Sequence, residues 1–299
     1  MRGIIHSVVI AATVASSAIL SSPPQALAQD ISAEEVTRKV NIAGRQRMLS
    51  QRMAKASCMM SQGIGEGTHF DQLTQAYDLF QRSDNALRFG DESMGLTEER
   101  RQAVLRALRR IDGPWIGYSN IIEDVIDAGA AEQAEMSDLS DTSLQVLKFM
   151  NMAVNQTARS YGNVLPDVPL SLTITIDVAG RQRMLTQKAM KETCLLFLTG
   201  DISHALSLEG TTSLFELSLT ALQEGFADVC VMAAPNTEIA EQLALVRNLW
   251  EPIRLELDRA TLSGRVNREV LTRLARDSDV LLREMNRAVG MYETVKPAA

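Results

Sequence analysis

Two arginines in matching surroundings are the side chains of this sequence best suited to bind a ligand. Arg47 and Arg183 lie within two copies of the segment Ala-Gly-Arg-Gln-Arg-Met-Leu, at residues 43–49 and 179–185. The guanidinium group is planar and presents a fork of donors that fits the edge of a planar oxyanion. The chemistry that this pattern favours is therefore the binding of a small anion.

Both arginines belong to a stripe of residues spaced alternately by four and three positions. The stripe is Val40, Gly44, Arg47, Gln51, Ala54 and Cys58 in the first copy, and Ile176, Gly180, Arg183, Gln187, Met190 and Cys194 in the second. Residues with this spacing share one helix face and form the seam against a partner helix. Gly44 and Gly180 let two backbones approach closely, but a guanidinium in a seam is costly unless an anion pairs with it.

The same segments concentrate positive charge in a chain whose formal net charge is −7. The further cations are Arg45, Arg52 and Lys55 in the first copy and Arg181, Lys188 and Lys191 in the second, with Glu192 as an acid beside them. In one hypothesis, Arg47 and Arg183 converge on one small anion, and Gln51 and Gln187 are neutral donors one turn away. In the other, the arginines are structural, and they pair with acids on neighbouring helices or lie exposed at the edge of the seam.

The three cysteines are too few for a disulfide scaffold, although an oxidising compartment permits one bridge. Cys58 follows Arg47 by about three helical turns and so lies on nearly the same face, as does Cys194 in the second copy. If the two helices are parallel neighbours, Cys58 and Cys194 face each other and can bridge. The alternative is two small buried thiols. Cys230 is expected to be a plain core residue.

An internal repeat extends far beyond the basic segment and divides the chain. Its matches continue through His69 and His204, Trp115 and Trp250, and Met150-Asn151 and Met285-Asn286. Between the copies, Pro166 and Pro169 disfavour a continuous helix. We therefore expect a signal peptide at 1–28 and two copies of one domain at 29–165 and 166–299.

Hydrophobic periodicity predicts four helices in each copy. In the first copy they span about 33–62, 70–89, 97–128 and 142–162, and the second copy opens with a helix at about 172–198. Thr97-Glu98 and Thr237-Glu238 have the hydroxyl cap and early acid of a helix start. Thr173–Ile176 favours a strand by propensity, but its counterpart in the first copy does not, so a helix is expected. The predicted fold is all-α, with two tandem antiparallel four-helix bundles after a signal peptide.

The first residues are typical of a secretory leader. Arg2 precedes an apolar stretch at 4–20, and Ala26-Leu27-Ala28 offers a small-residue cleavage site. The alternative is an uncleaved membrane anchor, for which the apolar stretch is short. No later segment has the length of a membrane span, so we expect a periplasmic protein that is not an integral membrane protein.

Several classes of function lack support in the sequence. An acidic chain has no general attraction for nucleic acid. His69 and His204 are isolated from other metal-ligating residues, so no metal and no cofactor is predicted. The sequence also has no nucleophile elbow, phosphate loop or zinc motif, and we expect no enzyme activity.

The repeated segments resemble the motif of PilJ/NarX-like sensory domains. The residues that carry the resemblance are Ala43-Gly44-x-x-Arg47-Met48-x-Ser50-x-Arg52 and Ala179-Gly180-x-x-Arg183-Met184-x-Thr186-x-Lys188. Such domains form the periplasmic part of nitrate/nitrite sensor kinases and the N-terminal part of type IV pilus methyl-accepting chemotaxis transducers. The resemblance implies a four-helix bundle that dimerises through its first helix. It also implies that one arginine from each side contacts the anion, and these arginines correspond to Arg47 and Arg183.

The expected function is that of a periplasmic sensor-type binding protein. It captures a small anion, such as nitrate or nitrite, between the two signature helices, which are the helices that carry the repeated segments at 43–49 and 179–185. It then reports to a membrane sensor or chemoreceptor in signal transduction or chemotaxis. The candidate ligand-binding residues are Arg47, Arg183, Gln51, Gln187, Gly44, Gly180, Arg45 and Arg181. The alternative is a ligand-free helical interaction module that docks a pilus, chemoreceptor or envelope partner.

Overall fold

A computed structural model of the chain describes residues 31–162 and 169–295. Every extended regular element in these residues is a helix, and extended pairing is confined to isolated bridges at Asp91–Leu96 and Phe226–Val231. The all-α prediction is thus confirmed. The expected signal peptide and the expected domain boundary at 165/166 lie outside the described residues.

The first half of the protein is built on a long helix α1 (Ala33–Ser61), which packs against α2 (Glu66–Phe89) and α5 (Met136–Tyr161). Two shorter helices, α3 (Gln102–Arg109) and α4 (Asp112–Ala128), lie along α5. The loops contain short 3-10 turns at Glu92–Met94 and Gln133–Glu135.

The second half repeats this plan with unbroken helices. Helix α6 (Leu170–Thr199) packs against α7 (Ile202–Glu224) and α9 (Arg268–Glu293), and α8 (Thr237–Ser263) closes the bundle against α7 and α9. A 3-10 turn at Ala227–Val229 precedes α8.

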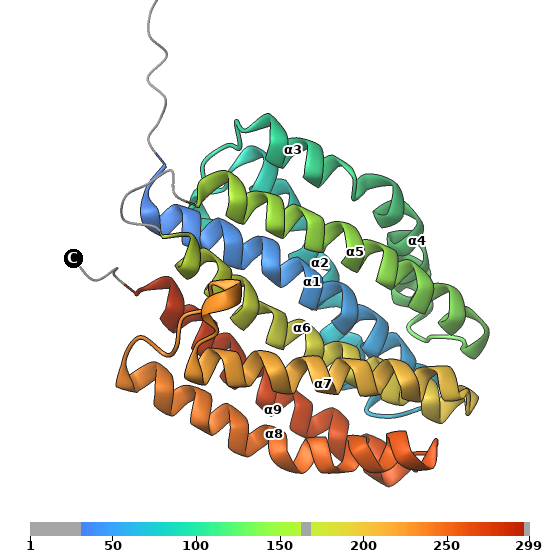
Figure 1. Ribbon diagram of the computed structural model, residues 1–299. Helices are drawn as coiled ribbons and strands as arrows, with labels where there is room; N and C mark the ends of the chain where they lie inside the picture. Colours follow the sequence, from blue (N-terminus) through green and yellow to red (C-terminus); the bar gives the residue numbers. More distant parts are fainter. Residues whose placement is uncertain (1–30, 163–168, 296–299) are drawn as a thin grey trace, which may run out of the picture. The chain divides into compact units, whose positions relative to one another are not determined.

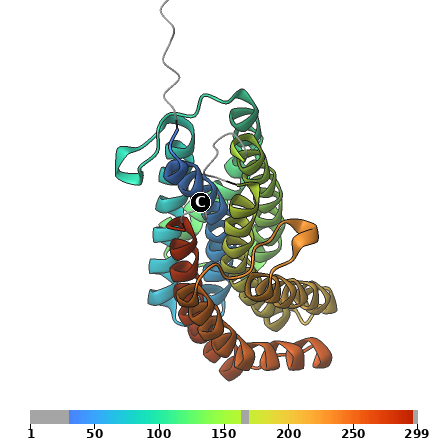
Figure 2. The same cartoon turned by 60° about the vertical axis from the view of Figure 1, so that its left-hand side comes forward.

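Helices α1 and α6 lie side by side and join the two halves (Figures 1 and 2). They run in parallel, because Arg47 in the middle of α1 reaches Asp177 in the first third of α6, and Cys58 reaches Cys194 near the ends of both helices. A disulfide links Cys58 to Cys194, whose Cα atoms are 6.2 Å apart. The first helix of each repeat is therefore the interface between the repeats.

The single helix expected at 97–128 is wrong, because this stretch forms α3 and α4 with a break around Arg110 and Ile111. Pro114 has no backbone N–H to bond the carbonyl of Arg110, and its ring clashes with that carbonyl in a straight helix. Thr97 does not cap a helix, since its backbone N–H and its hydroxyl both donate to Glu35 Oε1, at 2.7 and 2.6 Å.

The starts of α8 and α5 lie one and six residues before the expected positions. Asn236 caps α8 by accepting from the N–H of Ile239 at 2.9 Å, one residue before the expected start at Thr237. Helix α5 begins at Met136, six residues ahead of the start expected at 142. The strand-like segment Thr173–Ile176 is helical, as predicted.

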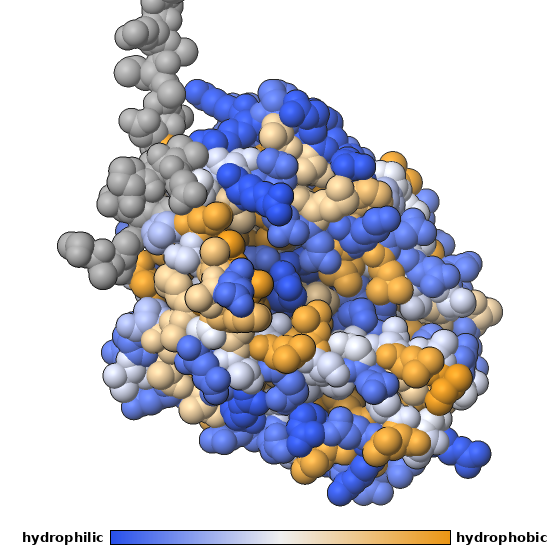
Figure 3. Space-filling view, viewed as in Figure 1, coloured by the Kyte–Doolittle hydropathy of each residue, from blue (hydrophilic) through white to orange (hydrophobic). Residues whose placement is uncertain are grey.

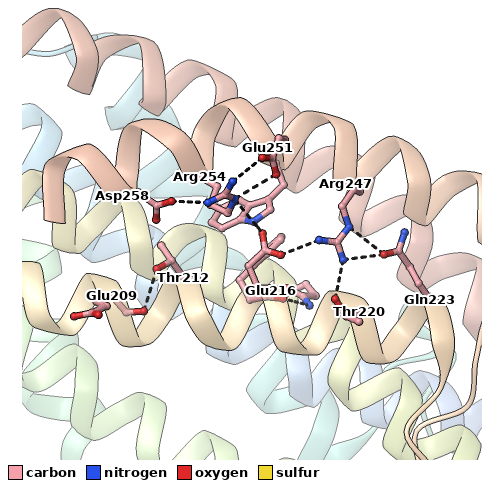
Figure 4. A network of polar contacts seen from close by, with 12 residues as sticks. Glu209, Thr212, Glu216, Thr220, Gln223, Arg247, Glu251, Arg254 and Asp258 are labelled. Atoms are coloured by element: carbon pink, nitrogen blue, oxygen red, sulfur yellow. Dashed lines mark hydrogen bonds and ion pairs between the residues drawn. The ribbon is translucent and has the colours of Figure 1, made fainter. Parts of the chain in front are cut away.

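Matched aromatic pairs confirm the repeat in three dimensions. Trp115 stacks on Phe80 and Trp250 stacks on Phe215, each with ring centroids 3.9 Å apart. The polar contacts around these pairs differ between the halves. Figure 4 shows Glu216 of α7 facing α8, where it accepts from the indole of Trp250 and from the guanidinium of Arg247.

In the first half the charges at this place are reversed. Arg88 of α2 pairs with Asp112 of α4 at 2.6 Å, whereas the matching residues of the second half are Gln223 and Arg247. The repeat therefore preserves the packing of the two helices while the polarity of the contact between them changes.

No helix in the described residues combines the length and the apolarity of a membrane span. The face in Figure 3 carries small apolar patches separated by hydrophilic side chains.

Removing the disulfide should destabilise the protein measurably. The bridge joins residues separated by 136 positions, so its loss frees a long loop in the unfolded chain. We expect the double variant Cys58→Ser, Cys194→Ser to lose about 2–4 kcal/mol in a urea unfolding experiment. Cys230→Ser serves as the control and should change stability little. Equal unfolding midpoints for the oxidised protein and the double variant would contradict this account.

Candidate functional site

The candidate site lies in the seam between α1 and α6. Both helices are buried around almost their whole circumference, because each is surrounded by two helices of its own half and by its counterpart. A helix buried on all sides is normally apolar. These two nevertheless carry Arg47 and Arg183, which are only 1 % and 3 % exposed.

Glycines make room for both guanidinium groups. A Cβ atom on Gly44 would lie 3.2 Å from Nη2 of Arg47 and 3.9 Å from Nη2 of Arg183. On Gly180 it would lie 3.2 Å from Nη2 of Arg183 and 3.7 Å from Nη2 of Arg47. The two arginines thus approach each other across the seam in a pseudo-symmetric arrangement.

Arg47 already has an anionic partner inside the protein. Its Nη2 lies 2.6 Å from Oδ1 of Asp177 on α6 and also donates to the Asp177 carbonyl at 3.2 Å. Its Nη1 donates to Asn151 Oδ1 on α5 at 3.1 Å. Burial lowers the pKa of Arg47, and the charge of Asp177 partly offsets this effect.

Arg183 has the same neighbours in the other half, with one difference. Its Nη2 donates to Oδ1 of Asn41 at 2.6 Å, and its Nη1 donates to Asn286 Oδ1 at 3.2 Å. Asn41 is the counterpart of Asp177, so a neutral amide replaces the carboxylate. Among the described residues, no carboxylate forms an ion pair with Arg183.

The electrostatic consequence is a buried cation without an ion pair in the described residues, on which the charge of Glu293 acts favourably without direct contact. Burial, together with the positive charges of Arg45 and Arg47, lowers the pKa of Arg183 to about 9. The side chain therefore remains charged at pH 7, in surroundings that disfavour the charge. A small anion beside Arg183 would relieve both effects.

The two glutamines one turn further along, Gln51 and Gln187, differ in whether their side-chain amides have hydrogen-bond partners. Gln51 donates from Nε2 to the Ser143 carbonyl at 3.1 Å. Gln187 is fully buried, and neither its nitrogen nor its oxygen has a hydrogen-bond partner within the part of the chain that the structure describes. An unpaired buried amide is costly, so Gln187 adds a second unsatisfied group on the same face of α6.

Arg45 and Arg181 flank the seam and do not enter it. Arg45 donates to the Ser83 hydroxyl on α2 at 3.0 Å, and Arg181 pairs with Oδ2 of Asp177 at 3.1 Å. Asp177 therefore binds two arginines at once. Arg45 and Arg181 were expected among the ligand-binding residues; their guanidinium groups contact Ser83 and Asp177, and Arg45 acts on Arg183 through its charge.

Sequence reasoning missed the residues that decide the charge of the seam. Asn41 and Asp177 occupy the same place in the repeat, as do Asn151 and Asn286. All four are polar and lie at matching positions of the internal repeat, which was the available signal. They were not singled out because they lie outside the stripe that carries the arginines.

The remaining candidate groups are the cysteines and the side chains that can bind a metal ion. Cys58 and Cys194 are buried in the bridge described above. The expectation that Cys230 is a core residue is wrong, because it is exposed at a loop tip with φ +57°. Its counterpart Gly95 has φ +62°, a conformation that favours glycine. Over residues 31–162 and 169–295, no cluster of three His, Cys, Asp or Glu side chains could hold a metal ion.

Two parallel helices with a charged seam, each in its own helical bundle, define a tandem all-helical module. The family described as the type IV pili methyl-accepting chemotaxis transducer N-terminal domain, PilJ, matches residues 31–142 and again residues 171–275. The chain belongs to this family, and it contains two copies of its domain in tandem. The family is a signalling module and not a family of enzymes. No curated protein matches the chain.

Removing each arginine should affect stability unequally. Arg47→Met leaves the Asp177 carboxylate buried with only Arg181 as a partner, and we expect a loss of about 2–4 kcal/mol in urea unfolding. Arg183→Met removes a charge that forms no ion pair in the described residues and should cost at least about 2 kcal/mol less. Asp177→Asn added to Arg47→Met should recover part of the loss. Equal losses for the two single variants would rule out the proposed charge asymmetry.

Acid pH should destabilise the protein through His69. This side chain is buried against Gln72 and near Lys55, and burial is the main cause that lowers its pKa to about 4. In the unfolded chain the pKa is about 6.5, so between these values only the unfolded state binds the proton. Lowering the pH from 6.5 to 4 should therefore cost about 3 kcal/mol of unfolding free energy more in the wild type than in His69→Gln. Parallel pH profiles of the two proteins would contradict the assignment.

Proposed function

We propose that this chain is a periplasmic sensory module that captures a small planar anion, nitrate or nitrite, beside Arg183 in the α1–α6 seam. The observation that carries the proposal is the pairing of a buried arginine with amides alone, where its counterpart has a carboxylate. Arginine donors in surroundings from which water is excluded suit a planar oxyanion. The unpaired amide of Gln187 supplies a neutral donor one turn away.

The proposed site uses the two arginines differently. Asp177 already neutralises Arg47, so the ligand acts mainly on Arg183. A single negative charge suffices to balance this arginine, which favours a monovalent anion over sulfate or phosphate. Gly44 and Gly180 keep the space next to both guanidinium groups free of side chains.

Signalling would follow from the tightness of the seam. Both arginines are almost completely buried, so an anion can enter only when α1 and α6 separate locally. A ligand that binds the separated arrangement more strongly shifts the population toward it. The disulfide between Cys58 and Cys194 limits the separation to the beginnings of the two helices.

We also propose a location and a partner for this module. The leader at 1–28 would export the protein to the periplasm, and the division into domains at 29–165 and 166–299 follows the repeat. The family implies interaction with the membrane chemoreceptor machinery, so we propose a chemoreceptor or membrane sensor as the recipient of the signal.

A second candidate function is a ligand-free docking module for a pilus, chemoreceptor or envelope partner. The ion pair between Arg47 and Asp177 favours it, because this carboxylate already occupies one side of the seam. In this reading, Asn41 and Asn286 satisfy Arg183 sufficiently, and the arginines only fix the register of the helices.

Substitutions at the matched pair Asn41 and Asp177 distinguish the two candidates. Nitrate at 100 times its dissociation constant should stabilise the wild type by about 2.7 kcal/mol in thermal unfolding, with chloride as the control. Asn41→Asp, combined with Glu293→Gln because Asn41 bonds Glu293, supplies the missing carboxylate and should abolish this shift. Asp177→Asn should strengthen binding, because it leaves both arginines free for the ligand.

The substitutions at Asn41 and Asp177 should change nitrate binding in opposite directions, and a general loss of structure would not produce both results. A wild type that nitrate and nitrite stabilise no more than chloride does would reject the anion site and leave the docking module.

A further inference from the structure

A second buried cation on α6 also lacks a carboxylate, eight residues beyond Arg183. Lys191 is 2 % exposed, and its Nζ donates to the Ser143 hydroxyl on α5 at 3.1 Å. No acid in the described residues forms an ion pair with it. Burial is the main cause that lowers the pKa of Lys191 to about 8.

The counterpart in the first half has a carboxylate partner. Lys55 Nζ lies 2.8 Å from Oδ1 of Asp279 on α9, and Gln72 donates to the other oxygen of that carboxylate at 2.7 Å. The residue that matches Asp279 in the repeat is Leu144 on α5. The second half therefore has no carboxylate at this position, and the neighbouring charge of Glu192 on α6 offsets only part of the effect of burial on the pKa of Lys191.

A cavity of about 460 Å³ lies where α5 begins, α6 ends and α7 begins, and three of its lining residues also border Lys191. We call it the junction cavity. Its lining includes Met136, Ser140, Asp141, Leu195, Asp201 and His204. Met136, Ser140 and Leu195 also line a crevice beside Lys191 that is too narrow to admit a water molecule. The volume of the junction cavity is in the range of small-molecule sites.

The charges of the junction cavity have two signs in separate places. Lys191 lies outside the cavity lining and shares the narrow crevice with Met136 and Ser140, while Asp141 and Asp201 line the cavity itself. Asp201 Oδ1 accepts from the N–H of Ser203 at 2.8 Å at the start of α7. A ligand that satisfies both ends needs a carboxylate for the lysine and a cationic group for the two aspartates.

We infer that the junction cavity binds a free α-amino acid, whose carboxylate pairs with Lys191 and whose ammonium group lies near Asp141 and Asp201. The ligand carboxylate then does for Lys191 what Asp279 does for Lys55. A simple amine leaves Lys191 without a carboxylate partner. A simple carboxylic acid brings no cationic group to balance Asp141 and Asp201. Met136 is unbranched and flexible, and its displacement opens the crevice to the ligand.

The matching cavity of the first half provides an internal comparison. It measures about 370 Å³ and is lined by His69, Asp279, Arg276 and Arg283 among others. Its lysine already has a carboxylate, so the cavity has no free place for the carboxylate of an amino acid. The protein should therefore bind one amino acid per chain.

Isothermal titration of the purified protein with the common L-amino acids tests the inference. For the amino acid that binds best, the corresponding amine and the corresponding deaminated acid serve as probes. We expect a stoichiometry of one per chain and at least about tenfold weaker binding of both analogues. Absence of binding by every amino acid, or equal binding of an analogue, would overturn the inference.

Leu144 offers a matched pair of variants, because it is partly exposed and tolerates a polar side chain. Leu144→Asp restores the carboxylate that Asp279 supplies in the other half and should weaken binding at least about tenfold. Leu144→Asn has the same size without the charge and should retain binding. Equal affinities of these two variants would refute the role of Lys191.

The inference is independent of the anion site. The double variant Asn41→Asp, Glu293→Gln should bind the amino acid as the wild type does, whether or not nitrate binds at Arg183. Loss of amino-acid binding in this variant would show that the two sites are one.

Discussion

The cost of burying positive charge is the constraint on which the arrangement of this protein depends. A cation removed from water is tolerated only when an anion or several oxygen acceptors surround it. On α1 the chain supplies a carboxylate for each of three buried cations. Lys39 pairs with Glu99, Arg47 with Asp177 and Lys55 with Asp279. Two of these acids come from the other half, so the same contacts that neutralise α1 also hold the halves together.

Helix α6 follows the same plan without the same compensation. Arg183 and Lys191 face oxygen atoms of amides and a hydroxyl where their counterparts face carboxylates. Lys188 does pair with Glu192, so the deficit is confined to the two cations that match Arg47 and Lys55. Among the described residues, Arg47 and Lys55 thus each form an ion pair with a carboxylate, and Arg183 and Lys191 form none.

Much of the architecture could be predicted from the repeat and from spacing alone. The alternation of four and three residues that includes Arg47 and Cys58 assigns them to one helix face, and the second copy does the same for Arg183 and Cys194. Parallel pairing of these faces brings the arginines together and places the cysteines within bridging distance. Periodicity is a strong signal because it depends only on helix geometry.

The remaining features depend on the register between helices, which one sequence does not specify. Asp177 neutralises Arg47 only because α1 and α6 are aligned as they are, and Asp279 reaches Lys55 from a helix distant in the chain. Local exceptions escaped prediction for other reasons. Pro114 breaks the helix expected at 97–128. Cys230 has an apolar side chain but lies at a loop tip, where the matching residue is Gly95 and both backbones have a positive φ. At this position the backbone conformation, rather than burial, determines which residues are favoured.

The fusion of two domains into one polypeptide has a genetic consequence. In a homodimer built from identical subunits, every substitution occurs on both sides of the symmetry axis, so a carboxylate that neutralises one arginine neutralises the other as well. Here the codons for Asn41 and Asp177 are separate, and evolution can alter one side of the pair alone. Tandem duplication therefore permits a division of labour in which one domain becomes a fixed scaffold and its twin is free to diverge.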